Sequence, residues 1–333
     1  MIVRSVVSFS ALVFAAATLA PIPSAAQPAK GWTPAFTSDG QPDLQGNWVN
    51  KNATPLERPK QLEGREFLTD AEVSELKARA VRIFESGNSD AANGDAVFLA
   101  ALANVEQYKN DNATGLTLFF DREFDNRTSL IVDPPDGKIP AYTPAGQQRR
   151  AAGAKATNMR NPPDRPEDMT AFQRCITFGV PMPRPGPFTS YYQIVQSPGY
   201  VVVVMEAIHD ARIIRLDTRL DGRPHLPENI RTWNGDSVGH WEGQTLVVDT
   251  TNFSPQDNFM GSAENLHLVE RFTRVAPEEI RYEITVDDPT TWVKPWTAVL
   301  RLKHTDEKIF ELACHEGNLR IMEDMLLSAR PHK

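Results

Sequence analysis

The feature that most constrains the fold is a series of short β-type segments that runs from Tyr191 onward with no helical pattern between them. Turn dipeptides such as Pro198-Gly199 and Asp221-Gly222 separate several of the segments. The eight candidate strands cover 191–196, 199–207, 211–217, 244–250, 266–275, 279–287, 295–303 and 308–314. Closely spaced strands of this kind predict an antiparallel meander, which closes into a barrel or folds into a sandwich.

The spacing of apolar residues indicates that each of these strands has one buried face and one solvent-exposed face. In the segment 280–286, Ile280, Tyr282 and Ile284 alternate with polar residues, which is typical of a half-buried strand. A small barrel of such strands leaves room for an interior cavity that holds one ligand, as in lipocalins. We therefore expect an all-β, antiparallel, barrel-like fold, with a lipocalin-like cavity as one form of it.

The part before Tyr191 adds a small helical region and a proline-rich segment. Thr69 and Glu72 form a capping-box pattern that starts a helix, and a second helix is expected over about 96–108. Shorter predictions are strands at 43–49, 116–120 and 128–132, a helix at 145–152 and a proline-rich excursion over 140–187. The predicted division is 1–26 as a signal peptide, 27–115 as an extended arm with helices, 116–190 as a hairpin and excursion, and 191–333 as the barrel-like body.

The first residues predict export. Arg4 precedes an apolar stretch over 6–20, which ends at prolines and at a small-residue cleavage pattern, Ser24-Ala25-Ala26. No later segment is long and apolar enough to span a bilayer. We expect a periplasmic or secreted protein, and the formal net charge of −8 excludes one that binds nucleic acid through charge alone.

The two cysteines, Cys175 and Cys314, can form a disulfide in an oxidising compartment. Such a bridge would tie the middle of the chain to its end. The alternative is a pair of buried free thiols.

No nucleotide-binding, nucleophile-elbow or zinc-protease motif occurs in the sequence, so the histidines are the main candidates for catalytic residues. Four histidines have an acidic residue close by in sequence: His209 with Asp210, His240 with Glu242, His267 with Glu270, and His315 with Glu316. A carboxylate beside an imidazole orients the ring and raises its basicity, which suits proton transfer. The plain alternative is that each is an ordinary histidine at a strand end.

The strand around His267 has two faces with different chemical consequences. Leu266, Leu268, Glu270 and Phe272 share one face, and His267, Val269 and Arg271 share the other. If the first face is the core, Glu270 is buried and acts as a general acid or base or pairs with an arginine. If the second face lines the cavity, Arg271 is placed to hold an anionic substrate group.

Several long strings carry a resemblance: Thr128–Gly137 (TSLIVDPPDG), His240–Phe253 (HWEGQTLVVDTTNF), Glu264–Phe272 (ENLHLVERF) and Ala313–Asn318 (ACHEGN). They resemble a large family of exported, uncharacterised proteins common in soil bacteria. The resemblance implies export and a shared fold, and it carries over no catalytic residue.

Two functions follow as hypotheses. The first is an enzyme that performs lyase, hydratase or hydrolase chemistry on a small organic molecule. In it His267 or His209 is the base, Asp210 or Glu270 the carboxylate and Arg271 the anion clamp. A variant has His209, His240, His267 and His315 bind a divalent metal that activates water. The second is a non-catalytic carrier with a lipocalin-like pocket for a small ligand.

Overall fold

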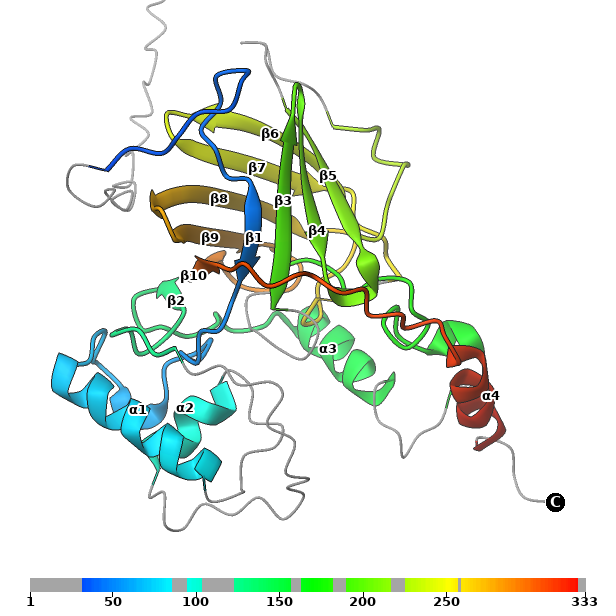
Figure 1. Cartoon of the computed structure of the whole chain (residues 1–333). Helices are drawn as coiled ribbons and strands as arrows, with labels where there is room; N and C mark the ends of the chain where they lie inside the picture. Colours follow the sequence, from blue (N-terminus) through cyan, green and yellow to red (C-terminus); the bar gives the residue numbers. More distant parts are fainter. Residues whose placement is uncertain are drawn as a thin grey trace, which may run out of the picture.

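The computed structural model describes residues 32–85, 95–103, 123–156, 163–181, 190–216, 225–256 and 259–328. Its centre is a closed barrel of nine strands (Figure 1). The strands are β1 (Gly46–Val49), β3 (Tyr191–Ser197), β4 (Tyr200–Met205), β5 (Ala211–Leu216), β6 (Asp236–Glu242), β7 (Thr245–Thr251), β8 (His267–Ala276), β9 (Glu279–Asp287) and β10 (Trp296–His304). Strand β1 closes the barrel by pairing with β3 on one side and β10 on the other. The predicted all-β barrel is confirmed.

Two strands of the sheet come from the part of the chain before the predicted barrel-like body, 191–333. β1 lies in the N-terminal arm, and β2 (Ile131–Asp133) adds to the edge of β10. The expected strand at 43–49 is therefore found, and the one at 128–132 is found shifted to β2. The expected strand at 116–120 lies outside the described residues.

Strand β6 was not among the expected strands, and it makes the one parallel pair in the barrel. Ile214 of β5 pairs with Ser237 of β6, and every other neighbouring pair is antiparallel. Ser237 and Gly239 alternate with outward-facing residues, so β6 shows little apolar signal. Gly239 packs closely, since a Cβ there would lie 2.8 Å from Cγ2 of Ile214.

The expected strand at 308–314 is wrong. These residues form no strand, and Phe310 is 71% exposed. The edge of β10 is already paired with β1 at His304 and Lys303 and with β2 at Thr297 and Ala298, so little of it is left for another strand. The chain instead runs on to Cys314 and then to α4 (Asn318–Ser328), a helix that was not expected.

The barrel interior is packed with side chains. Large buried residues include Trp48, Trp292 and Trp296, together with alternate residues of the strands, such as Leu268 and Phe272 of β8. Glu270 lies on the same face of β8 and is also buried. The face that carries Glu270 is therefore the core face, and His267 and Arg271 lie on the outside of the barrel.

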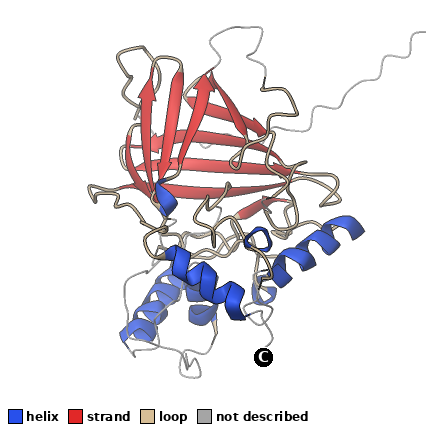
Figure 2. Cartoon of the chain, turned by 90° about the vertical axis from the view of Figure 1, so that its right-hand side faces the viewer, coloured by secondary structure: helices blue, strands red, loops and turns tan. Residues whose placement is uncertain are grey.

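The four described α-helices lie beyond one end of the barrel (Figure 2). Helix α1 (Asp70–Glu85) starts at the predicted capping box, where Glu72 accepts a hydrogen bond from the Thr69 backbone N–H at 2.8 Å. The hydrogen bond from Arg65 and, after it, this bond from Thr69 lower the pKa of Glu72 to about 2. Helix α2 (Asp95–Leu102) covers the first part of the helix expected over 96–108, of which 104–108 lie outside the described residues. Helix α3 (Pro144–Ala156) contains the helix expected at 145–152.

Cys175 and Cys314 form a disulfide, with Cα atoms 5.6 Å apart. The bridge fastens the segment before α4 to the proline-rich excursion, as expected for an oxidised protein. No helix in the described residues has the length and apolar character needed to cross a membrane. The expected signal peptide, 1–26, lies outside the described residues.

Candidate functional site

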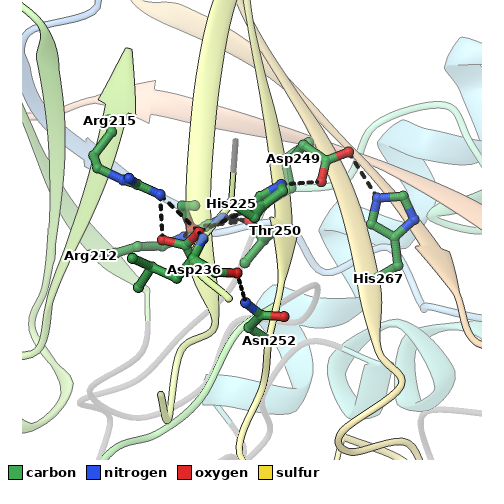
Figure 3. A network of polar contacts seen from close by, with 11 residues as sticks. Arg212, Arg215, His225, Asp236, Asp249, Thr250, Asn252 and His267 are labelled. Carbon is green, nitrogen blue, oxygen red and sulfur yellow. Dashed lines mark hydrogen bonds and ion pairs between the residues drawn. The ribbon is translucent and has the colours of Figure 1, made fainter. Parts of the chain in front are cut away.

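A chain of alternating histidine and aspartate side chains crosses the outer face of the barrel (Figure 3). Nε2 of His267 lies 2.8 Å from Oδ2 of Asp249, and Oδ1 of Asp249 lies 2.9 Å from Nε2 of His225. Nδ1 of His225 in turn lies 2.9 Å from Oδ2 of Asp236, to which Arg215 donates at 2.8 Å. We call these five residues the histidine–aspartate network.

The strands place the network on the outside by their alternation. Asp249 of β7 lies between Val248 and Thr250, which are both buried, so its own side chain points outward. Val238 of β6 pairs directly with Asp249, which puts Asp236 on the same outer face two residues along β6. His225 comes from the crossover between the parallel strands β5 and β6 and bridges the two aspartates.

The network sets the proton affinity of His267. The hydrogen bond to Asp249 raises the pKa of His267 above its ordinary value of 6.5, although partial burial opposes this. Burial alone would raise the pKa of Asp249, but the hydrogen bonds from His267 and His225 lower it. His267 is about 40% exposed, and its Nδ1 makes no hydrogen bond with any described residue. The ring is thus held on one side and open on the other.

A second polar cluster lies inside the barrel. Glu270 forms a two-point ion pair with Arg212, and the Tyr282 hydroxyl donates to Glu270. Burial and the nearby Glu270 carboxylate raise the pKa of Tyr282 well above its ordinary value. Burial alone would lower the pKa of Arg212, but Glu270 raises it. Of the two roles expected for a buried Glu270, the arginine pair is the one formed.

The cavity beside this cluster is small. Arg212, Tyr192, Tyr282 and Phe272 line part of it, and its volume is about 20 Å³. A space of this size holds about one water molecule. Side chains fill this part of the barrel, which leaves no room there for an organic ligand.

His240, Glu242 and Arg271 form a separate cluster on the outer face. His240 lies 3.2 Å from Glu242, as their i, i+2 spacing predicts, and Arg271 donates to the same carboxylate at 2.6 Å. The bond from Arg271 lowers the pKa of Glu242. Arg271 is four residues from His267 along β8, roughly 13 Å by the rise of a strand. It is therefore engaged by Glu242 rather than placed beside His267.

The remaining predicted residues lie elsewhere. Asp210 accepts hydrogen bonds from Thr177 and, at 2.7 Å, from Asn234 beside a surface pocket of about 320 Å³. His315 lies 3.9 Å from Glu311 in the segment before α4. The backbone of His209 lies in a short 3-10 helix, and its side chain is outside what the structure describes.

The predicted metal ligands are not brought together by the described side chains. His240, His267 and His315 each lie beside a different carboxylate. In the part of the chain that the structure describes, no three histidine, cysteine or carboxylate side chains are grouped to hold a metal ion.

Six participants were not predicted from the sequence: Arg212, Arg215, His225, Asp236, Asp249 and Tyr282. Their partners lie 11 to 58 positions away in the chain, so no local pattern reveals them. One signal was present for Asp249. Asp249 directly follows the apolar run Leu246-Val247-Val248 within the same strand. A charged residue at such a position indicates a polar partner on the outer face of the sheet. No family model, curated protein or solved structure matches the chain.

Proposed function

We propose that the protein is an exported enzyme that performs acid–base chemistry on a small organic molecule, with His267 as the residue that takes up and returns the proton. The observation that carries this proposal is the 2.8 Å contact between His267 Nε2 and Asp249. A histidine held by a carboxylate through one nitrogen, with the other nitrogen open, is the arrangement that general acid–base catalysis uses.

Each member of the network has a part in this proposal. Asp249 orients the His267 ring and stabilises its protonated form, and His225 fixes the second oxygen of Asp249. Asp236, which is 7% exposed and held by Arg215, anchors His225. Nδ1 of His267 then removes a proton from a carbon acid or from water and returns it to the product. This covers lyase, hydratase and hydrolase reactions, in which such a group contributes a factor of about 10²–10⁴ in rate.

The carrier hypothesis draws less support from the interior of the barrel. Ligand pockets for small organic molecules are typically about 300–1,000 Å³. The cavity beside Arg212 and Tyr282 in the barrel has only about 20 Å³. A lipocalin-like ligand site inside this part of the barrel would require its core side chains to move.

Export is proposed on the disulfide. Cys175 and Cys314 form a bridge across 139 positions of the chain. Structural disulfides persist in oxidising compartments, such as the periplasm and the extracellular space. This agrees with the predicted signal peptide and supports a periplasmic or secreted location.

The enzyme proposal is tested with a panel of small esters, lactones and unsaturated carboxylic acids incubated with the purified mature protein. Substrate loss is followed by NMR. His267→Gln is expected to reduce turnover of any accepted compound at least 100-fold. His240→Gln is the matched control, because His240 is also an exposed outer-face histidine beside a carboxylate. Turnover that survives in His267→Gln, or a panel in which no compound is consumed, counts against the proposal.

A further inference from the structure

Arg58 is a buried cation with no anionic partner in the described part of the chain. Its side chain is 4% exposed, yet no described carboxylate lies within ion-pair distance of its guanidinium. Nε donates to Thr128 Oγ1 at 2.9 Å, and Nη1 donates to the Pro135 carbonyl at 3.0 Å. Both acceptors are neutral. Since buried charges are normally paired, a site of this kind calls for a counter-ion from elsewhere.

The turn at 134–137 fixes the guanidinium in place. The Arg58 backbone N–H donates to the Gly137 carbonyl at 2.8 Å. Gly137 has a φ of +69°, and a Cβ there would lie 3.0 Å from Cζ of Arg58 and 2.5 Å from Oγ of Ser129. Only glycine leaves room for the guanidinium to lie against the turn. The Pro-Pro-Asp-Gly turn thus positions the Arg58 side chain.

Arg58 lines a pocket of about 540 Å³, a volume typical of small-molecule sites. Two more cations, Lys138 and Arg150, line the same pocket, and neither forms an ion pair with a described residue. The guanidinium of Arg150 lies 4.9 Å above the ring of Tyr142, which is also in the pocket wall. The Tyr142 hydroxyl is buried and has no hydrogen-bond partner among the residues that the structure describes.

The rest of the wall is mainly apolar. Leu56, Ile139 and Met260 contribute aliphatic surface, and Glu57 is the one acidic residue among the described residues that line the pocket. Oε1 of Glu57 already accepts a hydrogen bond from the Ile139 backbone N–H at 3.0 Å. Three cations against one carboxylate, next to apolar and aromatic surface, suit a ligand with an anionic head and an apolar body.

We propose that this pocket binds a small organic carboxylate, with its carboxylate at Arg58 and its apolar part against Tyr142 and the aliphatic wall. The N–H groups of Arg58 not used by Thr128 and Pro135 donate to the ligand, and Lys138 and Arg150 add charge. The site does not depend on the acid–base proposal, because no residue of the histidine–aspartate network lines the pocket.

The test is calorimetric titration of the mature protein at neutral pH with sodium benzoate, its neutral isostere benzamide, and inorganic phosphate. We expect benzoate to bind with one-to-one stoichiometry. Benzamide should bind at least tenfold more weakly because it lacks the charge, and phosphate more weakly than benzoate because it lacks the apolar body. Arg58→Gln should weaken benzoate binding at least tenfold.

Two further variants keep the result interpretable. Lys138→Gln removes a less buried cation and should weaken benzoate binding by a smaller factor, even if Arg58→Gln folds poorly. Arg82→Gln, an exposed arginine of α1 outside the pocket, should leave binding unchanged. The proposal is overturned if benzoate does not bind, if benzamide binds equally well, if phosphate binds better than benzoate, or if folded Arg58→Gln and Lys138→Gln both bind benzoate like the wild type.

Discussion

Asp249 lies between two histidines, with Oδ2 at 2.8 Å from Nε2 of His267 and Oδ1 at 2.9 Å from Nε2 of His225. One carboxylate therefore serves both rings on the outer face of a closed barrel. This arrangement has consequences for pH dependence that can be measured without knowing the substrate.

The first prediction concerns the pH dependence of stability. The pKa of His267 is raised in the folded protein above its ordinary value of 6.5, so the protonated ring stabilises the fold. That contribution is fully present below pH 6.5 and is lost as the pH rises through the folded pKa. Urea unfolding across this range should show the wild-type advantage over His267→Gln shrink with rising pH. A constant difference between the two proteins would contradict the linkage.

The second prediction concerns the buried pair of Glu270 and Arg212. Glu270→Gln leaves the buried guanidinium without its counter-charge, which should reduce the free energy of unfolding by about 3–5 kcal/mol. The double variant Glu270→Leu/Arg212→Met removes both charges and should recover much of that loss. Urea unfolding measures both. A single variant that loses less than about 1 kcal/mol would show that the pair is not desolvated as described.

The third prediction concerns the disulfide. Cys175→Ser with Cys314→Ser opens a loop of 139 positions, which costs up to about 4–5 kcal/mol in the chain-entropy model. Thermal unfolding should occur at a lower temperature in the double variant than in the oxidised wild type. Adding a reductant should lower the wild-type unfolding temperature and leave the double variant unchanged. Equal unfolding temperatures for the two proteins without reductant would contradict a structural role for the bridge.

The fold could be predicted from the sequence wherever the local pattern was strong. The alternation through Ile280 and Tyr282 predicted the buried face of β9, and the capping box at Thr69 predicted the start of α1. The parity of β8 placed Glu270 and His267 on opposite faces, although only the structure decides which face is the core.

Long-range pairing is what the sequence could not reveal. The inward positions of β6 are occupied by Ser237 and Gly239, so the strand shows no apolar alternation. Its parallel partner, β5, is connected to it by a long crossover. The carboxylate beside His267 is Asp249, 18 positions away, rather than the nearby Glu270. Successive residues of a strand point to opposite faces, so a carboxylate close to a histidine in sequence can lie on the other face of the sheet. The carboxylate that contacts His267 comes from the adjacent strand.

The role of Asp249 is tested by an NMR titration of the His267 ring protons in three proteins: wild type, Asp249→Asn and Glu242→Gln. We expect Asp249→Asn to lower the pKa of His267, because the hydrogen bond and charge that favour its protonated form are lost. Glu242→Gln removes the carboxylate of the neighbouring His240 cluster and should leave the pKa of His267 unchanged. A His267 pKa that is the same in wild type and Asp249→Asn would contradict the claim that Asp249 prepares this histidine for proton transfer.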